Sequence, residues 1–395
     1  MKILMINSVC GIRSTGRICT DLATELEREG HEVKIAYGRE SVPEKFQKYA
    51  VRIGNDFDVK LHGLKARLAD ASGFGSKNAT KKFIRWVKEY NPDVVHLHNI
   101  HGYYINIKIL FDYLRESNKP VIWTLHDGWS FTGHCSKFFG GCTKWESRCY
   151  ACPAKHTYPK SFVDRSSYNY VTKKQIFTSL SNVTVVTPSK WLADITNKSF
   201  LNKFKITVVN NGIDINVFKP TYGEFREKYQ LENKKIVLGV ASAWGKSKGL
   251  YDFIKLAEKL DDRYQVVLVG VSEKQQSELP DNIIAISLTN STEELAEIYT
   301  AADVFVNPTY SDTYPTVNLE AHACGTPVIT YRTGGSVESA HADCIVEQGD
   351  IENLVKKICR NDAKCKDGLV LDKSMMLNEY LEIYKNCVVK KHEKI

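Results

Sequence analysis

Residues 303–332, "DVFVNPTYSDTYPTVNLEAHACGTPVITYR", carry the pattern that decides the fold of this 395-residue chain. A short apolar strand candidate, "DVFVNP", is followed by a loop, by a helical stretch from Val317 to Ala323 and by a second strand candidate, "TPVITYR". Strands that alternate with helices predict a parallel sheet with helices on its faces. Asp312 lies in the loop and Glu320 lies eight positions later in the helix, so two carboxylates in an apolar unit need an explanation.

The same alternation runs along the whole chain. Further strand candidates are "KILMINSV", "HEVKIAYG", "PDVVHLHN", "KPVIWTLHD" and "NVTVVTPS" in the first half, and "KKIVLGVAS", "YQVVLVGV" and "NIIAIS" in the second half. Helical stretches lie between them at Thr15–Arg28, Thr80–Tyr90, Gly249–Leu260 and Thr292–Ala302. Continuous apolar strands are typical of parallel sheets that are covered on both faces. Because the alternation restarts after about residue 210, we predict an α/β protein with two doubly wound domains.

The boundary between the two domains is expected near "KFKITVVNNGIDINVFKP", where an Asn-Gly pair predicts a turn and a proline predicts a break. We therefore predict a first domain over residues 1–207, with a cysteine-rich insertion at about 128–160, and a second domain over residues 208–371. Residues 372–395 hold a last amphipathic helix, Asp372–Val389, with no strand after it. This helix is free to pack back on the first domain.

The composition is that of a globular protein, with 43% hydrophobic and 25% charged residues. No stretch approaches the roughly 18 uncharged apolar residues that cross a bilayer. The N-terminal "MKILMINSVCGIRS" is expected to form a first strand, because a signal peptide needs a longer apolar run and a small-residue cleavage site. Eleven cysteines in a large chain argue against a disulfide framework. We therefore expect a cytoplasmic protein.

Basic residues are concentrated in the first half of the chain. Residues 1–205 hold 32 Lys and Arg against 18 Asp and Glu, whereas residues 206–395 hold 22 against 28. Such an asymmetry concerns the partners of a protein rather than its fold. It favours binding of an anionic partner, namely a phosphate-bearing substrate, an acidic lipid surface or nucleic acid. The alternative is a basic surface that is only solvated and binds no such partner.

The unit around Asp312 suits an anionic ligand. A loop carboxylate and a second one about two turns along the helix can face one ligand from different heights. The backbone amides of Tyr314, Thr316 and Val317, at the helix N-terminus, suit a diphosphate. The alternative is a capping acid with a solvated glutamate, and the flanking strands and the small-residue helix weigh against it.

"SDTYPTVNLEAHACGTPVI" resembles the E-x7-E signature of the family 4 retaining glycosyltransferases, which have the GT-B architecture of two Rossmann-like domains facing across a cleft. In that family the second glutamate binds the ribose hydroxyls of a nucleotide-sugar donor, a role that the resemblance gives to Glu320. The first acid contacts the donor sugar, and this role falls to Asp312, where the family usually has glutamate. The resemblance covers nearly the whole chain.

Two further segments of the second domain resemble this family. "NNGIDINVF" is similar to an N-G-x-D-x-x-x-F segment, which places Asn211 on the donor side, and "GVASAWGKSKGLYDFIKLAEKL" is similar to a segment that carries a basic pair onto the donor diphosphate. Lys248 matches the lysine of that pair, and Lys246 is the nearest cation in place of the missing arginine. A cation is needed because the leaving nucleoside diphosphate gains charge as the sugar departs. Without the flanking pattern, two lysines in a loop would indicate a solvated turn.

The first domain offers two weaker signals. "SVCGIRSTGRICTDLATEL" places Gly16 near the first strand–helix junction, where glycine permits close approach of a ligand. The loop is not a G-x-G-x-x-G fingerprint, which argues against a nicotinamide enzyme. "WTLHDGWSFTGHC" is similar to a family segment whose histidine contacts the transferred sugar, and this histidine corresponds to His126. The alternative is a hydrogen-bonded structural histidine.

Further histidines follow the third strand candidate of the first domain, in "HLHNIHGYYIN". Alternation along the strand places His96 and His98 on the same face, but no carboxylate or cysteine completes a metal-ligand set. We predict instead a polar wall in which Asn99 and His101 contact the acceptor.

The segment "HCSKFFGGCTKWESRCYACP" holds four cysteines with the spacings x6, x6 and x2. A C-x2-C pair is typical of structural zinc, and four thiolates would complete a tetrahedron. Such a metal would stabilise an insertion that lacks an obvious core. Structural zinc and four reduced thiols both stay open for these residues, which are Cys135, Cys142, Cys149 and Cys152.

Residues 61–90 mix apolar residues at helical spacing with many lysines and arginines. Basic amphipathic segments lie on acidic membrane surfaces, although they also pack on their own sheet. Together with the basic first half, the segment favours peripheral contact with an anionic membrane, at the inner face of the cell membrane. Nucleic acid fits less well, because no recognition motif is present.

These observations predict a retaining hexosyltransferase that moves a sugar from a UDP- or GDP-sugar to a lipid-diphosphate-linked glycan in surface polysaccharide assembly. No cofactor is required for catalysis if lysines and helix amides hold the leaving charge. One alternative is a GT-B-like nucleotide-sugar 2-epimerase, which needs no acceptor. Another is a non-catalytic partner subunit that binds nucleotide or glycan, which the missing arginine and Asp312 favour.

Overall fold

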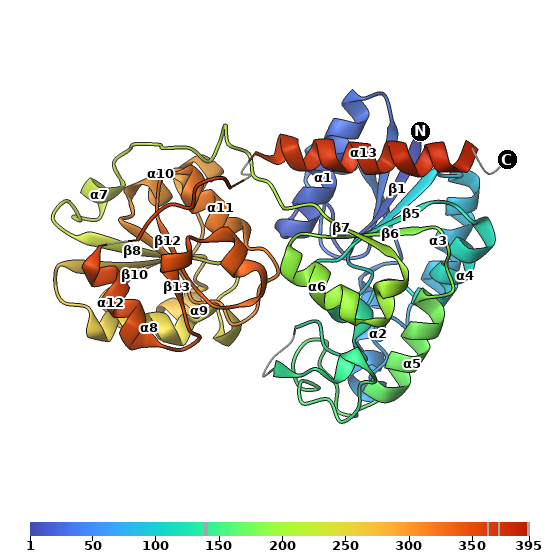
Figure 1. Ribbon diagram of the computed structural model, residues 1–395, viewed down its shortest axis with the longest axis horizontal. Helices are drawn as coiled ribbons and strands as arrows, with labels where there is room; N and C mark the ends of the chain where they lie inside the picture. The colour runs from blue at the N-terminus through green and yellow to red at the C-terminus, as the bar shows by residue number, and fades with distance from the viewer. Residues whose placement is uncertain (138–140, 362, 370–371, 393–395) are drawn as a thin grey trace. The chain divides into compact units, whose positions relative to one another are not determined.

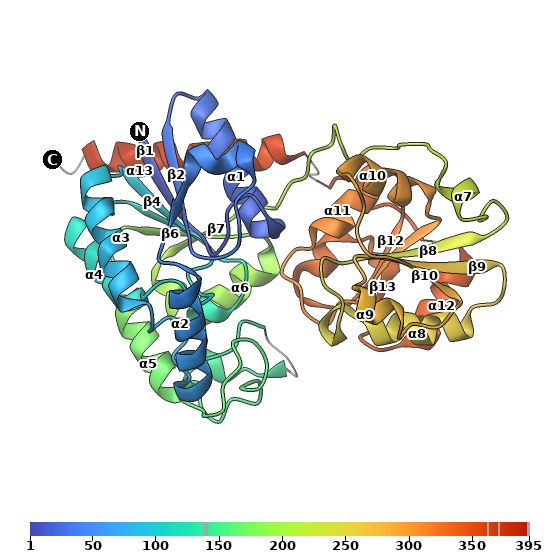
Figure 2. The same cartoon turned by 180° about the vertical axis from the view of Figure 1, so that it is seen from behind.

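The computed structural model describes residues 1–137, 141–361, 363–369 and 372–392, with side chains described as far as Cys387 in the last helix. The chain divides into two compact units, one formed by Met1–Val209 together with the chain from Leu377 onward, and the other by Asn210–Met376. Each unit has a parallel sheet with helices on both of its faces (Figures 1 and 2). In the part of the chain described, no helix combines the length and apolarity needed to span a membrane.

The first unit is built on a seven-stranded sheet in the order β3-β2-β1-β4-β5-β6-β7, and every neighbouring pair is parallel. Its strands are β1 (Lys2–Ile6), β2 (Glu32–Tyr37), β3 (Ala50–Arg52), β4 (Val94–Leu97), β5 (Val121–Thr124), β6 (Val183–Thr187) and β7 (Lys205–Val208). Its helices are α1 (Arg13–Arg28), α2 (Asp56–Ala69), α3 (Lys77–Tyr90), α4 (Ile107–Ser117), α5 (Ser166–Phe177), α6 (Lys190–Lys198) and most of α13 (Lys373–His392). Short 3-10 helices are η1 (Glu44–Tyr49), η2 (Trp129–Phe131), η4 (Lys144–Glu146) and η5 (Phe200–Lys203).

The second unit is built on a six-stranded parallel sheet in the order β10-β9-β8-β11-β12-β13. Its strands are β8 (Lys235–Val240), β9 (Tyr264–Val269), β10 (Ile283–Ile286), β11 (Val304–Asn307), β12 (Val328–Tyr331) and β13 (Ile345–Val346). Its helices are α7 (Phe225–Lys228), α8 (Leu250–Lys259), α9 (Glu273–Gln276), α10 (Thr292–Ala301), α11 (Thr316–Ala323) and α12 (Ile351–Arg360). Its 3-10 helices are η6 (Lys246–Lys248), η7 (Gly334–Ser339) and η8 (Ala342–Cys344).

The predicted fold class of two doubly wound parallel-sheet units is confirmed, and every strand named from the sequence is present. The strands β3, β7 and β13 were not predicted from the sequence, and all three lie at sheet edges. These strands are short, and segments such as "AVR" and "IV" contain too few residues to form a pattern.

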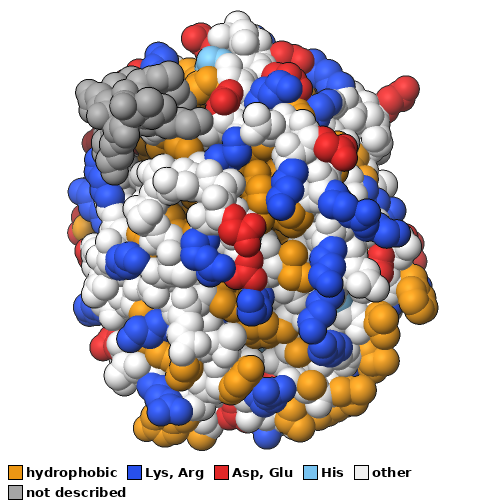
Figure 3. All heavy atoms as spheres, turned by 90° about the vertical axis from the view of Figure 1, so that its right-hand side faces the viewer, with side chains coloured by type: hydrophobic (Ala, Val, Ile, Leu, Met, Phe, Trp, Pro, Cys, Tyr) orange, Lys and Arg blue, Asp and Glu red, His pale blue; other side chains and the backbone are white. Residues whose placement is uncertain are grey.

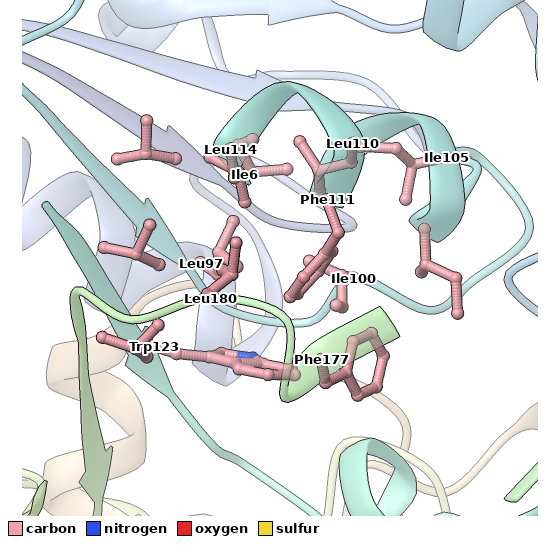
Figure 4. Close-up of a cluster of buried hydrophobic side chains, with 14 of the residues drawn as sticks. Ile6, Leu97, Ile100, Ile105, Leu110, Phe111, Leu114, Trp123, Phe177 and Leu180 are labelled. Atoms are coloured by element: carbon pink, nitrogen blue, oxygen red, sulfur yellow. The ribbon is translucent and has the colours of Figure 1, made fainter. Parts of the chain in front are cut away.

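An aromatic core in the first unit joins the sheet to α4 and α5 (Figure 4). The ring of Trp123, from β5, lies 5.5 Å from that of Phe111 and 4.9 Å from that of Phe177, measured between ring centroids. All three side chains are buried. This packing fixes the carboxyl end of β5, after which His126 follows two residues later.

Two tyrosines hold α13 against the sheet of the first unit. The Tyr384 hydroxyl lies 2.5 Å from His96 Nδ1, and the Tyr380 hydroxyl lies 2.9 Å from Thr124 Oγ1. Thr124 Oγ1 in turn lies 2.8 Å from His96 Nε2. Because all four side chains are buried, both ring nitrogens of His96 depend on these partners.

Replacing Tyr384 with phenylalanine should destabilise the first unit. The change leaves the buried Nδ1 of His96 without this partner, which typically costs about 1–3 kcal/mol in the free energy of unfolding. Urea denaturation followed by circular dichroism measures the loss. Tyr168→Phe is the matched control, because Tyr168 is exposed and its hydroxyl can be lost at little cost. Equal stabilities for the two variants would contradict this account of α13.

Candidate functional site

The lysine and the loop carboxylate that the sequence pattern singled out meet in the second unit. Lys248 ends η6, which follows β8, and Asp312 lies in the loop between β11 and α11. The Lys248 ammonium lies 2.6 Å from Asp312 Oδ2, and the two side chains are 30% and 16% exposed. A positive and a negative group thus stand side by side beyond the carboxyl ends of two neighbouring strands.

Backbone contacts hold the two loops of this ion pair together. Tyr310 N donates to the Ser247 carbonyl oxygen at 3.0 Å, and the Thr309 hydroxyl donates to the same oxygen at 3.2 Å. Gly249 has a φ of +74°, and a Cβ at this position would lie 2.4 Å from the Pro308 carbonyl oxygen. Only glycine permits this approach without strain, so the backbone sets the position of the ion pair.

Lys246, expected in place of the family arginine, lies at the start of η6. Its side chain is exposed, in contrast to the half-buried side chain of Lys248. Lys246 thus shares its loop with Lys248, and its role toward a diphosphate stays a prediction.

Glu320 lies on the second turn of α11 and is only 5% exposed. The hydroxyl of Tyr299, from α10, donates to Glu320 Oε2 at 3.0 Å. A carboxylate has about four lone-pair sites, so one carboxylate can accept from a tyrosine hydroxyl and from ligand hydroxyls together. Tyr299 was not predicted as a site residue, because a tyrosine on the apolar side of a helix has the pattern of an ordinary core residue.

The first turn of α11 presents backbone amides. The helix begins at Thr316, and the first N–H groups of a helix have no carbonyl partner within it. Thr316 and Val317 are half-buried, whereas the Tyr314 ring is buried, which raises the pKa of its hydroxyl to about 12. The Tyr314 carbonyl accepts a hydrogen bond from Asn211 Nδ2 at 3.2 Å. Asn211 was predicted to contact the nucleotide-sugar donor, and in the structure its side chain positions the loop before α11.

A buried polar network lies beneath α11. Asn318 Nδ2 donates to Ser339 Oγ at 2.9 Å, and Asn318 Oδ1 accepts from Asn307 Nδ2 at 2.8 Å. The hydroxyls of Thr330 and Ser336 lie 2.7 Å apart. These bonds join the start of α11 to η7 and to the ends of β11 and β12. They therefore fix the direction of α11. No motif pointed to them, because uncharged polar residues scattered over several elements form no local pattern.

In the first unit, the residues that follow β4 and β5 form a histidine cluster. His126 Nε2 lies 3.0 Å from His98 Nδ1, and the two rings are stacked with centroids 5.3 Å apart. The His98 ring lies 4.0 Å from that of His96, because alternation along the strand places both on one face. Burial lowers the pKa of His126 to about 4 and that of His96 to about 3, so both are neutral at pH 7.

Asp127 and His101 form a second polar pair. His101 Nε2 lies 2.9 Å from Asp127 Oδ2, and His101 Nδ1 lies 3.1 Å from the Tyr158 hydroxyl. Burial acts to raise the pKa of Asp127, but His101 and the Trp129 backbone amide lower it more, and the net pKa is lowered. Asn99, predicted with His101 as an acceptor contact, donates its backbone amide to an asparagine oxygen at 3.3 Å.

Gly16 lies within α1, after the loop that was expected to bind a ligand. Its carbonyl oxygen accepts from Gly11 N at 3.1 Å, and a Cβ at Gly16 would lie 3.1 Å from Val9 Cγ2. The glycine therefore allows α1 to pack closely on its own preceding loop. The contact predicted between Gly16 and a ligand stays a prediction.

The four cysteines of the insertion line one pocket. Gly133 N donates to Cys149 Sγ at 3.2 Å, and the thiols of Cys135 and Cys152 are hydrogen-bonded to each other. Across the described ranges, which leave out residues 138–140, no group of three or more His, Cys, Asp or Glu side chains is arranged to hold a metal ion. Zinc is therefore not shown in the described residues, and structural zinc and four reduced thiols both stay open for these cysteines.

Known sequences resemble the chain over nearly its whole length. Residues 15–217 match Glycosyltransferase Family 4, and residues 234–361 match Glycosyl transferases group 1. WcaC of Escherichia coli K12, a protein assigned to colanic acid biosynthesis as a glycosyl transferase, is 24% identical over 412 residues, which cover 98% of this chain and 100% of WcaC. The N,N'-diacetylbacillosaminyl-diphospho-undecaprenol alpha-1,3-N-acetylgalactosaminyltransferase of Campylobacter jejuni is 28% identical over 209 residues, which cover 47% of this chain and 55% of that protein.

Solved structures resemble the chain in fold. Sucrose-phosphate synthase from Thermosynechococcus elongatus has a TM-score of 0.72 at 17% identity, covering 98% of this chain and 99% of that one. HepE of Anabaena, in complex with UDP and glucose, has a TM-score of 0.67 at 14% identity, covering 98% of this chain and all of HepE. At these identities the likeness shows the fold alone, which is the GT-B fold.

Buried neutral histidines should make the first unit sensitive to mild acid. Burial lowers the pKa of His62 and His126 to about 4 and that of His96 to about 3, below the value of about 6.5 for a free histidine. As the pH falls below about 6.5, the unfolded chain takes up protons that the folded chain cannot, so the free energy of unfolding falls. We expect the melting temperature to drop between about pH 6.5 and pH 5, above the range in which ordinary carboxylates titrate.

Thermal denaturation at constant ionic strength measures this dependence. His62→Gln should make the melting temperature less dependent on pH, whereas His156→Gln should leave the dependence unchanged, because His156 is exposed. A melting temperature that stays constant across this range would contradict the neutral-histidine account.

Proposed function

The chain belongs to glycosyltransferase family 4, and we propose that it is a retaining hexosyltransferase that uses a UDP- or GDP-sugar as its donor. One observation carries the proposal: the Lys248–Asp312 ion pair, the first turn of α11 and the buried Glu320 belong to one group of adjoining loops and one helix. Helix amides and a cation suit a diphosphate, and a carboxylate further along the helix suits hydroxyl groups.

Each residue of the second unit takes a separate role in donor binding. Glu320, held by Tyr299, accepts hydrogen bonds from the ribose hydroxyls. The amides of Thr316 and Val317 receive the diphosphate, and Asn211 holds the loop that leads to them. Asp312 binds a hydroxyl of the donor sugar and also orients Lys248.

In the proposed reaction the bond between the anomeric carbon and the diphosphate oxygen breaks, and the acceptor hydroxyl attacks the same face of the sugar. The electron pair of the broken bond stays on the diphosphate. Lys248, with Lys246 and the amides of α11, stabilises this added charge. The acceptor proton can pass to the leaving diphosphate, so no protein nucleophile and no catalytic metal are needed.

His126 is proposed to contact the transferred sugar. A neutral imidazole can donate or accept one hydrogen bond to a sugar hydroxyl without adding a charge. Its ring is oriented by His98, whose Nδ1 lies 3.0 Å from His126 Nε2. This neutral state is supported by burial, which lowers the pKa of His126 to about 4.

The acceptor is proposed to be a lipid-diphosphate-linked glycan in surface polysaccharide assembly. The names of the relatives support this choice, because one is assigned to colanic acid biosynthesis and another names a diphospho-undecaprenol. The basic first half of the chain also suits a substrate that carries phosphate. We place the enzyme in the cytoplasm, where nucleotide sugars are made.

The Glu320→Gln variant should lose nucleotide binding while keeping its fold. Glutamine retains an oxygen for Tyr299 but lacks the charge that strengthens bonds to ribose hydroxyls, so affinity should fall about 10- to 100-fold. UDP or GDP at about 100 times its dissociation constant should stabilise the wild type by about 2.7 kcal/mol, and the variant by much less. Thermal unfolding with each nucleotide measures both values.

Glu293→Gln is the matched control for this experiment, since Glu293 is exposed on α10 and this variant should bind nucleotide as the wild type does. If neither nucleotide stabilises the wild type at saturation, the donor site is wrong and the non-catalytic subunit gains support. Product formation from donor alone, without acceptor, would instead indicate the 2-epimerase.

The Lys248→Met variant should lose transfer much more than donor binding. Removing a donor that stabilises developing charge typically costs about 100- to 1,000-fold in kcat. The Lys246→Met variant, altered in the same loop at an exposed position, should lose less. Steady-state kinetics with a lipid-linked acceptor measures both, and equal rates for wild type and Lys248→Met would contradict the proposed role of Lys248.

A further inference from the structure

Helix α2 exposes a stripe of large apolar side chains. Phe57, Leu61, Leu64 and Leu68 are between 53% and 70% exposed. At about 100° per residue, their spacing places all four within an arc of about 60° on the helix surface. Scattered single apolar residues are ordinary on a protein surface, but a contiguous row of four on one helix face marks an interaction site.

The stripe is not the core face of α2. The buried residues of this helix are His62 and Ala66, which lie on the opposite side. His62 Nε2 accepts from Gly75 N at 3.0 Å, and its Nδ1 lies 2.9 Å from Ser76 Oγ, so the inner face is fixed to the unit. The N-terminal end is also fixed, by a capping box between Asn55 and Asp58. The helix is thus held with its apolar stripe outward.

Exposed cations flank the apolar stripe. Lys60 and Arg67 lie on one side of it and Lys65 on the other, by the same helical spacing. A helix with an apolar row between lysines and arginines is typical of a segment that lies in the interface of a membrane. Long basic side chains can keep their charges at the level of the lipid head groups while the apolar row enters the acyl region.

A neighbouring loop extends the stripe. Phe162 N donates to the Arg67 carbonyl oxygen at 2.8 Å, and Ser161 Oγ donates to the same oxygen at 3.2 Å. The side chains of Phe162 and Val163 are exposed, as is the side chain of Lys160. Residues about 100 positions apart in sequence thus present the same combination of apolar and basic groups on one surface.

We infer that this surface docks the first unit on a bilayer that contains anionic lipid. The docking surface consists of Phe57, Lys60, Leu61, Leu64, Lys65, Arg67, Leu68, Lys160, Phe162 and Val163. Its charge decides the partner: three cations beside the stripe would oppose one another across an interface with a second copy, but they complement anionic head groups. Figure 3 shows a face of the first unit with many more basic than acidic side chains, and hydrophobic side chains gather toward its lower margin.

The docking surface lies close to the polar pair of the first unit. A Cβ at Gly63 of α2 would lie 3.6 Å from the Tyr103 ring, and Tyr103 lies 5.9 Å from the Tyr158 ring between centroids. Tyr158 is hydrogen-bonded to His101, which pairs with Asp127. Under the proposed function, on which this step rests, the bilayer would deliver a lipid-linked acceptor to these residues. Membrane contact itself does not depend on that function.

Vesicle flotation with the full chain tests the inference. The wild type should bind vesicles of phosphatidylcholine with about one third phosphatidylglycerol much more than vesicles of phosphatidylcholine alone, and added salt should weaken the binding. The double variant Leu61→Ser/Leu64→Ser should bind at least about 10-fold less, because two leucines that would enter the acyl region of the bilayer are lost. Leu288→Ser is the control, since Leu288 is even more exposed than Leu61 and Leu64 but lies in the second unit.

A second variant separates the electrostatic attraction to anionic lipid from the apolar attraction to the bilayer. Lys60→Gln/Lys65→Gln should weaken binding to the anionic vesicles and reduce its dependence on salt. Both double variants alter exposed side chains, so their melting temperatures and their stabilisation by nucleotide should match the wild type. This readout keeps a failure of the donor site distinct from a failure of the docking surface.

Three results would overturn the inference. If the wild-type protein stays in the unbound fraction with both kinds of vesicle, the first unit does not dock on a bilayer. Equal binding by wild type and Leu61→Ser/Leu64→Ser would place membrane contact elsewhere. A wild-type dimer in sedimentation experiments that the same double variant dissociates would assign the stripe to a second copy of the chain.

Discussion

The parallel pairing of β8 with β11 is the constraint on which the candidate donor site depends. Because parallel strands end at the same edge of a sheet, the loops that carry Lys248 and Asp312 begin next to each other. The bonds to the Ser247 carbonyl and the close approach at Gly249 then bring the two charges together. A partly exposed ion pair adds little to stability by itself. The backbone, and not the attraction of the charges, therefore decides where the pair lies.

Features that repeat at the spacing of a strand or a helix could be predicted from the sequence. Apolar runs such as "KPVIWTLHD" and "DVFVNP" identified β5 and β11, and therefore the loops that follow them. Asp312 and Glu320 could be singled out because they are charged residues in an apolar unit after a strand end, whereas Lys248 was singled out by the resemblance to a known family. The resemblance to a known family then gave each of them a role. Local pattern thus predicted the fold class, and the roles given to the charged residues stay predictions.

The remaining contacts could not be predicted, because they join residues that are distant in sequence. His96 and Tyr384 are 288 positions apart, and Tyr299 meets Glu320 from another helix. Asp127 follows His126 directly in the sequence, but its side-chain partner in the structure is His101. The α2 stripe was only partly anticipated: residues 61–90 were singled out as a basic amphipathic segment, but periodicity alone does not tell which apolar face is buried and which is exposed.

The two departures from the family pattern fall on the same ion pair. Asp312 stands where the family usually has glutamate, and no arginine accompanies Lys248. Asp312 is paired with Lys248 in the structure and neutralises its charge. Under the proposed function, the lysine therefore gives its full charge to a diphosphate only when Asp312 accepts a hydrogen bond from another group. A hydroxyl of the bound sugar is such a group. Binding of the sugar would then release the cation that stabilises the leaving group, whereas a spent nucleotide would meet a neutral pair and depend on Glu320 and the helix amides alone.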